Sequence, residues 1–286
     1  MRRSVQVKIL AILVLFVATA CIWYAAIQED SRGVLTVSFL DVGQGDSIFI
    51  RAPGGRQVLI DGGKGVSVLR QISKHIPWYD KTIDVVIGTH PDQDHIGGLV
   101  EVLQRYRVAH IVKSSVLDTE GPDFKAFEKA ISEEEGAEVL EAVRGEVIDM
   151  GNGAYLEILF PDRRVSSIET NTGSVVARLV YGTTAFMLTG DAPAEIEKYL
   201  VSLDGTKLKS NVLKAGHHGS KSSSGPLFLG YVAPEYGVYS RGCDNSYGHP
   251  AQQTIDTFAR FEIPTLDTCE EGTIIFVSDG ITVSRR

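Results

Sequence analysis

Hydrophobic and polar positions divide this chain into one long apolar stretch near its start and many short apolar runs after it. Short apolar runs bounded by turn residues are typical of buried strands, and apolar positions three or four residues apart are typical of helices. Strands are predicted over 35–40, 47–51, 58–60 and 84–88, and in a second series over 174–181, 184–189, 212–214, 236–239 and 273–277. Helices are predicted over 66–75, 98–107, 122–135, 193–203 and 251–260. Because the pattern changes at about Gly173, we expect one α/β domain with two β-rich halves, each with its own helices.

The long apolar stretch covers residues 9–27 (ILAILVLFVATACIWYAAI) and contains no charged side chain. Since roughly 20 apolar residues are needed for a helix to cross a bilayer, this stretch is long enough. Arg2, Arg3 and Lys8 precede it, and basic residues on that side keep the start of the chain in the cytoplasm. We therefore expect residues 1–30 to form a membrane anchor or signal segment, and residues 31–286 to form a domain outside the cytoplasm.

Two other interpretations of the apolar stretch stay open. Ala18-Thr19-Ala20 fits the small-residue pattern of a signal-peptide cleavage site, and Cys21 could carry a lipid. The length favours an uncleaved anchor, because the apolar core of a signal peptide has about 7–15 residues and this run continues to Ile27. The expected location is therefore the cell membrane, with a single span and an extracytoplasmic domain.

Charge limits the kind of partner. The formal net charge is −8, and the sequence has no basic stripe of the kind that marks a nucleic-acid surface. A local basic patch stays open, because four basic residues lie near the later motifs: Lys209, Lys214, Lys221 and Arg241. Cys243 and Cys269 are the only cysteines outside the apolar stretch. One disulfide between them is possible, but a framework of several disulfides is excluded. Neither cysteine has the spacing of a metal ligand.

The most informative motif is THPDQDHIGG, which directly follows an apolar run. It places the imidazoles of His90 and His95 and the carboxylates of Asp92 and Asp94 in one short segment. Two carboxylates this close repel each other in a low dielectric unless cations neutralise them, and neutral imidazole and ionised carboxylate are ligands that Zn²⁺ and Mn²⁺ accept. The motif therefore predicts half of a two-metal hydrolytic centre.

Two later segments end in the same kinds of side chain. TTAFMLTGD is an apolar strand that ends in Asp191, and KSNVLKAGHHGS leads from another apolar segment to His217 and His218. Strands that each end in a small residue followed by Asp or His would bring these side chains to one edge of a sheet. We expect Asp191 to bridge two metals there and one of the paired histidines to complete the second site.

Together, HPDQDH, LTGD and GHHGS resemble the motifs of the metallo-β-lactamase superfamily. With Asp92 at the second position of the first motif, they resemble the hydrolase-like domain of the ComEC family of bacterial DNA-uptake proteins. Four more segments are similar to motifs of that family: FLDVGQGD (39–46), LIDGG (59–63), NTGSVV (171–176) and YGHP (247–250). The resemblance covers about residues 33–284 and implies an αββα sandwich with the ligand loops at one edge of the paired sheets. The ComEC channel, a bundle of many membrane helices, has no counterpart in this chain.

The resemblance also implies roles for individual residues around two divalent ions, Zn²⁺ or Mn²⁺. The expected ligands are His90, Asp92 and Asp191 for the first ion, and Asp94, His95, Asp191 and His218 for the second, with His217 as the alternative to His218. Catalytic roles are expected for Asp94, His217 and His249. Asp61 is expected to hydrogen-bond a ligand histidine, and substrate contacts are expected from Gln44, Asn171, Ser174 and Ser220.

The function that the resemblance implies is a metal-dependent hydrolase, namely a phosphodiesterase or nuclease that acts on single-stranded DNA or another phosphodiester. The expected partners are that substrate, the membrane through residues 9–27, and a separately encoded DNA-uptake channel. The acidic charge argues against tight nucleic-acid binding, because phosphate contacts supply most of that affinity. Two alternatives are a hydrolase of a small phosphoester, lactam or other ester in the cell envelope, and a non-catalytic accessory subunit of an uptake channel. Cutting of single-stranded DNA, with phosphocholine and lactam substrates left intact, would distinguish the nuclease from the hydrolase of a small substrate.

Overall fold

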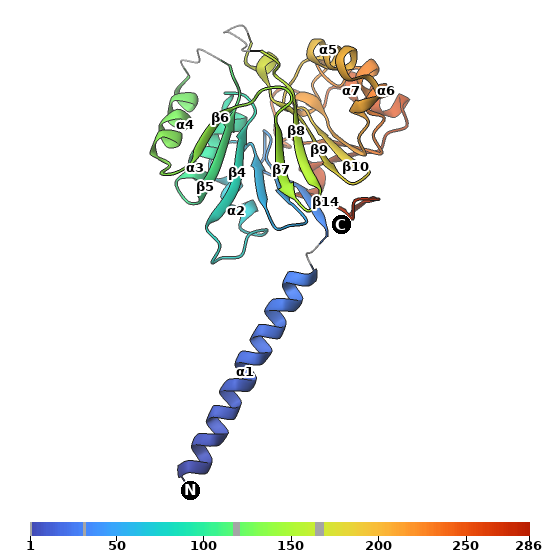
Figure 1. Cartoon of the computed structure of the whole chain (residues 1–286). Helices are drawn as coiled ribbons and strands as arrows, with labels where there is room; N and C mark the ends of the chain where they lie inside the picture. Colours follow the sequence, from blue (N-terminus) through green and yellow to red (C-terminus); the bar gives the residue numbers. More distant parts are fainter. Residues whose placement is uncertain (1, 31–32, 117–120, 164–168) are drawn as a thin grey trace.

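The computed structural model describes residues 2–30, 33–116, 121–163 and 169–286, and it joins one long helix to a layered domain (Figure 1). The first sheet contains β1 (Leu35–Phe39), β2 (Ile48–Arg51), β3 (Gln57–Ile60), β4 (Thr82–Gly88), β5 (Arg107–Lys113), β6 (Glu138–Glu141), β14 (Ile274–Ser278) and β15 (Val283–Arg285). Its strand order is β15-β14-β1-β2-β3-β4-β5-β6. From β3 to β6 neighbouring strands are parallel, whereas β15, β14, β1, β2 and β3 pair antiparallel.

The second sheet contains β7 (Val147–Gly151), β8 (Ala154–Phe160), β9 (Val176–Tyr181), β10 (Thr184–Leu188), β11 (Val212–Lys214), β12 (Tyr236–Tyr239) and β13 (Thr265–Asp267). Its order is β13-β12-β11-β10-β9-β8-β7, with parallel pairing from β10 to β13. Both sheets therefore have a parallel half, and the carboxyl ends of those parallel strands carry the candidate site.

The main core lies between the two sheets. Alternate residues of β1, such as Val37 and Phe39, pack there with Phe186 and Leu188 of β10 and with Phe276 of β14. The period of two is what a strand with one face in the core requires. Burial of this inner layer holds the sheets face to face.

Helices cover the outer face of each sheet. The first sheet is covered by α2 (Ser67–Ile72), α3 (Gln93–Leu103) and α4 (Pro122–Glu133), and the second by α5 (Ala194–Asp204), α6 (Pro226–Val232) and α7 (Gln252–Arg260). Leu99 and Phe127 are buried under the helices of the first sheet, and Leu200, Phe228 and Phe258 are buried under those of the second. The predicted αββα sandwich is confirmed.

The N-terminal helix, α1 (Arg2–Asp30), extends away from the domain (Figure 1). Residues 5–24 form a span that is long enough and apolar enough to cross a membrane, and none of this span is buried inside the structure. The chain enters the domain at Gly33, whose carbonyl accepts a hydrogen bond from the hydroxyl of Tyr181 (2.9 Å), and then begins β1. Because β1 starts at the edge where β3 and β4 also start, α1 joins the domain at the edge opposite the carboxyl ends of those parallel strands.

Three predictions about the elements were wrong. The helix predicted over 98–107 begins at Gln93 and ends at Leu103, and residues from Arg107 onward form β5. Gly97 and Gly98 were interpreted as the start of this helix, but both lie inside it. Glycine stands here because α3 packs directly on a neighbouring loop. A Cβ added to Gly98 would lie 2.1 Å from the carbonyl oxygen of Gly62, so only glycine fits this contact.

The other two errors concern the grouping of strands. The second sheet begins at β7, well before the change predicted at Gly173, because the hairpin of β7 and β8 was not recognised. The strand predicted over 273–277 was placed with the later series, whereas β14 pairs with β1 in the first sheet. Long-range pairing of this kind leaves no local signal in the sequence.

Candidate metal centre

The candidate centre lies at the carboxyl ends of parallel strands from both sheets. Asp61 follows β3, His90 lies just beyond β4, Asp191 lies just beyond β10, and the 3₁₀ turn Gly216–Gly219 with its two histidines follows β11. Asp94 and His95 lie in the first turn of α3. Because neighbouring parallel strands end at one edge, residues far apart in the sequence meet there.

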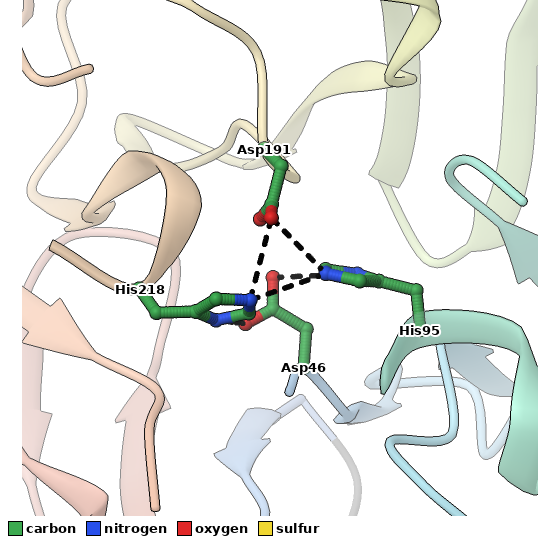
Figure 2. A group of neighbouring side chains, drawn as sticks. All are labelled: Asp46, His95, Asp191 and His218. Carbon is green, nitrogen blue, oxygen red and sulfur yellow. Dashed lines mark hydrogen bonds and ion pairs between the residues drawn. The ribbon is translucent and has the colours of Figure 1, made fainter. Parts of the chain in front are cut away.

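Asp191 occupies the middle of the group. Its Oδ2 atom lies 3.3 Å from Nε2 of His95 and 3.3 Å from Nε2 of His218 (Figure 2). The two Nε2 atoms are themselves 3.3 Å apart, so no more than one of them can carry a proton directed at the other. Asp94 approaches the same point, with Oδ2 at 3.4 Å from Nε2 of His218.

The opposite sides of the two rings are held by the protein. Nδ1 of His95 donates to Oδ2 of Asp61 (2.8 Å), and Nδ1 of His218 donates to the carbonyl of Ser240 (2.8 Å). Asp61 also accepts from the amide and the hydroxyl of Thr89 (2.8 and 2.6 Å), which fixes its carboxylate. A partner on Nδ1 sets the tautomer that leaves Nε2 free as a ligand.

A second set of donors approaches the same Oδ2 atom of Asp191. His90 is buried, and its Nε2 atom has no hydrogen-bond partner although it lies 3.7 Å from Oδ2 of Asp92 and 3.9 Å from Oδ2 of Asp191. His217 is more exposed and points Nε2 at Asp191 from 3.7 Å. These separations are too long for hydrogen bonds, so the atoms converge on a space between them. A buried ring nitrogen without a partner is uncommon in proteins and fits an ion at that place.

The donor set therefore fits metal ions. Four buried side chains, Asp46, His95, Asp191 and His218, offer ligand atoms within 4.8 Å of one another. Imidazole nitrogen and carboxylate oxygen are ligands of Zn²⁺ and of other divalent first-row ions. Asp46 differs from the other three, because it approaches the Nδ1 atoms of His218 (3.2 Å) and His95 (3.9 Å), which already donate elsewhere. We place Asp46 behind the rings and Asp191 on their ligand side.

Sequence reasoning missed Asp46 and Lys214 as parts of this centre. The sequence places Asp46 in a tight turn, with a structural role or a substrate contact as the two interpretations, yet Asp46 is buried and its Oδ2 atom lies 2.5 Å from Nζ of Lys214. Lys214 is fully buried on β11, donates to the carbonyl of Gly190 (2.7 Å) and lies 3.4 Å from Oδ1 of Asp191. The position of Asp46 in the FLDVGQGD segment was a signal for it, whereas Lys214 had only its place just before the two histidines.

Two of the four basic residues near the later motifs cannot contribute to a basic surface patch. Lys214 is inaccessible, and the guanidinium of Arg241 is held by Asp267, with Nε to Oδ2 at 2.7 Å. Neither can contact a nucleic acid without giving up a buried or half-buried partner. Lys209 and Lys221 alone do not form a basic surface.

Charges inside the centre compensate one another. Burial alone would lower the pKa of His95, but the carboxylates of Asp191 and Asp61 outweigh it and raise the pKa well above its usual value. The pKa of His218 is raised in the same way by Asp191 and Asp46. Burial would raise the pKa of Asp46, whereas Lys214 and His218 lower it to about 2. Three carboxylates, two imidazoles and one ammonium thus lie close together in a buried space, where a metal can replace imidazole protons.

His249 lies beside the centre at its open side. Its ring is 5.4 Å from that of His217 and 5.7 Å from that of Tyr247, and its Nδ1 atom has no partner. Burial, with help from His217, lowers the pKa of His249 to about 4, so the ring is neutral near pH 7. A neutral imidazole here can accept or pass a proton.

The four residues expected to contact substrate have different surroundings. Nδ2 of Asn171 lies 3.4 Å from Nδ1 of His217, and its Oδ1 atom has no partner. Ser174 is fully buried and accepts from the amide of Asp191 (3.3 Å), so it positions that carboxylate. Oε1 of Gln44 accepts from the amide of Gly242 (3.2 Å), and Ser220 contacts the hydroxyl of Ser222 (3.0 Å). Of these four, Asn171 lies directly beside a histidine of the centre.

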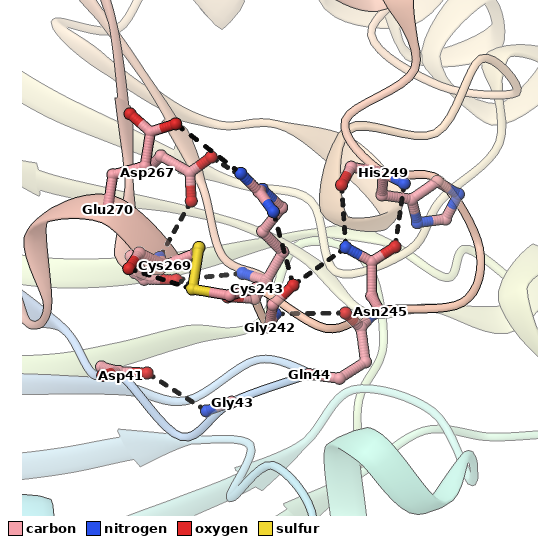
Figure 3. Close-up of a disulfide and its surroundings, with 12 residues drawn as sticks. Asp41, Gly43, Gln44, Gly242, Cys243, Asn245, His249, Asp267, Cys269 and Glu270 are labelled. Carbon is pink, nitrogen blue, oxygen red and sulfur yellow. Dashed lines mark hydrogen bonds and ion pairs between the residues drawn. A yellow bond between two sulfur atoms is a disulfide. The ribbon is translucent and has the colours of Figure 1, made fainter.

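A disulfide between Cys243 and Cys269 fixes the loop that carries His249 (Figure 3). The Cα atoms are 5.0 Å apart, and Cys269 lies in the short helix α8 (Thr268–Glu271). From the same loop, Asn245 donates to the carbonyls of Gly242 (2.9 Å) and His249 (2.8 Å) and accepts from the amide of His249 (2.9 Å). The bridge that the sequence left open is present, and it restrains the backbone beside the centre.

The chain is similar to curated proteins over most of its length. The chain is 32% identical over 260 residues to ComE operon protein 3 of Bacillus subtilis (strain 168), which covers 83% of this chain and 32% of that protein. It is 31% identical over 252 residues to Competence protein ComA of Neisseria gonorrhoeae, covering 88% of this chain and 33% of that protein. The chain thus spans about a third of the length of these curated relatives.

Among solved structures, Igni18, a metallo hydrolase from Ignicoccus hospitalis KIN4/I, superposes with a TM-score of 0.56 at 17% identity, covering 84% of this chain and 98% of that one. This likeness supports the fold. The family model described as the Metallo-beta-lactamase superfamily matches residues 40–242, a segment that contains both sets of candidate ligands. The chain belongs to the metallo-beta-lactamase superfamily.

Proposed function

We propose that this protein is a membrane-anchored, extracytoplasmic, dinuclear metal-dependent hydrolase that cleaves phosphodiesters, with single-stranded DNA as its substrate. The observation that carries the proposal is the position of Asp191, whose Oδ2 atom lies within 3.9 Å of the Nε2 atoms of His90, His95, His217 and His218. One carboxylate oxygen surrounded by four imidazoles suits a ligand that bridges a pair of ions.

The proposed ligands are His90, Asp92 and Asp191 for one ion, and Asp94, His95, His218 and Asp191 for the other. When bound, two such ions would supply Lewis-acid stabilisation of charge on the phosphoryl oxygens. Asp61 and Ser240 hold the rings of His95 and His218 in place. His217 and His249, which are partly exposed at the open side, face the space where a substrate phosphate would lie. Both have a lowered pKa, so they enter the reaction as neutral bases.

The disulfide supports the proposed side of the membrane. Disulfides form and persist outside the cytoplasm and are rare inside it, and Cys243 and Cys269 are bridged. Basic residues before the apolar helix favour the same orientation. Together they support an anchor in α1 with the domain on the outer face, where a separately encoded DNA-uptake channel would be its partner.

A relative named Competence protein ComA, together with the resemblance to the DNA-uptake family, supports DNA as the substrate. Electrostatics limits how DNA can bind, because Lys214 and Arg241 are engaged inside the protein and the net charge is −8. We therefore infer that only a short stretch of strand is held, with the ions themselves making the main phosphate contacts. The affinity for DNA should then depend only weakly on salt concentration. The slope of log affinity against log salt concentration grows with the number of neutralised phosphates, and a short stretch of strand has few of them.

The same electrostatics favours one alternative, hydrolysis of a small phosphoester. A small substrate needs no basic surface beyond the centre, and none is formed by the four basic residues near the later motifs. The two functions differ in substrate and share the centre.

Cleavage of a labelled single-stranded oligonucleotide by the full chain in detergent with Mn²⁺ tests the proposal. We expect cutting that is abolished in Asp94→Ala and His95→Ala and retained in Asp256→Ala, whose carboxylate is exposed on the outer face of α7 and pairs with Gln252. His249→Ala should slow turnover more than it lowers metal content. Circular dichroism checks that each variant is folded. Turnover of a small phosphodiester without cutting of DNA by the metal-loaded protein would favour the alternative.

A further inference from the structure

A separate pocket lies on the outer face of the first sheet, on the opposite side of β1 from the core. It has a volume of about 400 Å³ and is lined by strands β1, β2 and β14, by residues just after α2, and by Arg286. The size falls within the range of small-ligand sites, about 300–1,000 Å³. None of the metal-centre residues named above lines it.

The strand register explains which side chains face this pocket. Val37 and Phe39 of β1 point into the core, so Thr36 and Ser38 point to the outer face. Thr36 pairs with Arg51 of β2, and Ser38 pairs with Ile275 of β14. All four of these residues line the pocket. The register therefore places a guanidinium and two hydroxyls on one wall.

Ser38 is unusual among the lining residues. It is fully buried, and its hydroxyl has no hydrogen-bond partner. An unsatisfied buried polar group costs about 1–3 kcal/mol, so proteins seldom keep one without a reason. A ligand atom in the pocket would supply the missing partner.

The charged side chains that line the pocket are all basic among the described residues. They belong to Arg51, Lys74 and Arg286, and no carboxylate side chain is among the lining residues. This contrasts with a net charge of −8 for the whole chain. Burial and the neighbouring positive charges of Arg51 and Lys74 lower the pKa of His75, which agrees with a positive potential at this place.

The geometry points to a binding site for a phosphate group in this pocket, held by Lys74, Arg51 and the hydroxyl of Ser38. Arginine and lysine beside hydroxyl donors match the several acceptor oxygens of phosphate. The phosphate can come from a soluble phosphomonoester or from a phospholipid headgroup. The site does not depend on the proposed nuclease activity, because it shares no residue with the metal centre.

Titration calorimetry on the full chain in uncharged detergent, after chelation has removed metals, tests the site. Inorganic phosphate and glycerol 3-phosphate are the soluble probes, with sodium chloride at matched ionic strength as the reference. Short-chain phosphatidylglycerol and phosphatidylcholine are the lipid probes. We expect saturable phosphate binding that chloride does not reproduce. Competition by phosphatidylglycerol, but not phosphatidylcholine, would assign the site to a lipid headgroup, and competition by neither would assign it to a soluble phosphomonoester.

Two variants connect the binding to this pocket. Lys74→Gln and Ser38→Ala should each weaken phosphate binding about tenfold, since a hydrogen bond to a charged group contributes on that order. Lys129→Gln is the matched control, because Lys129 is also an exposed lysine with one weak local partner. Ser38→Ala should keep or raise the thermal midpoint, because it removes an unpartnered hydroxyl. No phosphate binding by the wild type, or unchanged binding in both variants, would overturn the inference.

Discussion

Asp191 is the proposed bridging ligand of the centre, because the Nε2 atoms of all four histidines lie within 3.9 Å of its Oδ2 atom. We expect the purified protein to bind two divalent ions, Asp191→Ala to lose both, and Asp92→Ala to lose about one. Elemental analysis after reconstitution with Zn²⁺ or Mn²⁺ measures this. Asp256→Ala serves as the control, and a wild-type content near one ion would contradict the dinuclear assignment.

Lys214 is a buried cation placed against two carboxylates, with Asp46 at 2.5 Å and Asp191 at 3.4 Å. Lys214→Met keeps the length of the side chain but leaves these carboxylates uncompensated. Removing one partner of a buried ion pair costs about 3–5 kcal/mol. We expect a loss of that size in the metal-free protein and a smaller loss with metal bound, because the ions supply positive charge. Urea unfolding with and without Mn²⁺ measures the difference, and equal losses in both states would contradict this role.

Glu197 on α5 gives a pH dependence that can be separated from the metal centre. It is buried and accepts from the amides of Ser224 (2.6 Å) and Gly225 (2.8 Å), which anchors the loop after the two histidines. Burial raises its pKa from 4.5 to about 7 despite these hydrogen bonds. A raised pKa means that the folded state binds the proton more tightly than the unfolded state. The stabilisation that protonation of Glu197 gives the folded state is therefore complete below about pH 4.5 and is lost as the pH rises to about 7.

We therefore expect Glu197→Gln to remove roughly 3 kcal/mol of pH-dependent change in the free energy of unfolding between these values. Chemical unfolding at several pH values measures it. The absolute stability of the variant can fall, since glutamine offers only one acceptor to the two amides. The decisive quantity is the slope with pH, and a slope equal to that of the wild type would contradict the prediction.

At the scale of elements, the disulfide joins the loop of His249 to α8 across a sequence separation of 26 residues. Closing a loop of this size contributes about 3 kcal/mol in the chain-entropy account. We expect Cys243→Ser with Cys269→Ser to lose stability on that order. Catalytic turnover should fall while metal content stays constant, because the bridge restrains His249 and none of the ligands. Loss of metal in the double variant would show that the bridge acts on the centre itself.

Several elements of the centre could be predicted from the sequence because their signals are local. Apolar runs that end in Gly-Asp or His-His mark strand ends, and the position of Asp191 and His218 beyond β10 and β11 follows from them. The start of α3 was misjudged because its two glycines serve a close contact with the loop at Gly62. Lys214 could not be foreseen as part of the centre, because its environment comes from Asp46 and Asp191, which are remote in sequence. Pairing of β14 with β1 is equally non-local.

At the scale of the whole molecule, the orientation of α1 in a membrane would determine on which side the domain lies. We expect an alkaline phosphatase fused after Asp30 to be active, because the basic N-terminus keeps the start of the chain inside and that enzyme requires export. A Cys21→Ser variant should stay in the membrane fraction, since the proposed anchor is the apolar helix itself. An inactive reporter would place the domain in the cytoplasm. Release of the cysteine variant into the soluble fraction would instead identify a lipid as the anchor.

The edge at which α1 enters the domain has a consequence for how substrates arrive. Strand β4, which runs from that edge to the centre, has seven residues and spans about 20 Å. With α1 in a bilayer and β4 upright above it, the candidate ligand histidines would stand about that far above the headgroups and open toward the aqueous compartment. Lipid esters that remain in the membrane could not reach them. Only molecules that approach from solution, or a strand that is threaded past that height, would be processed.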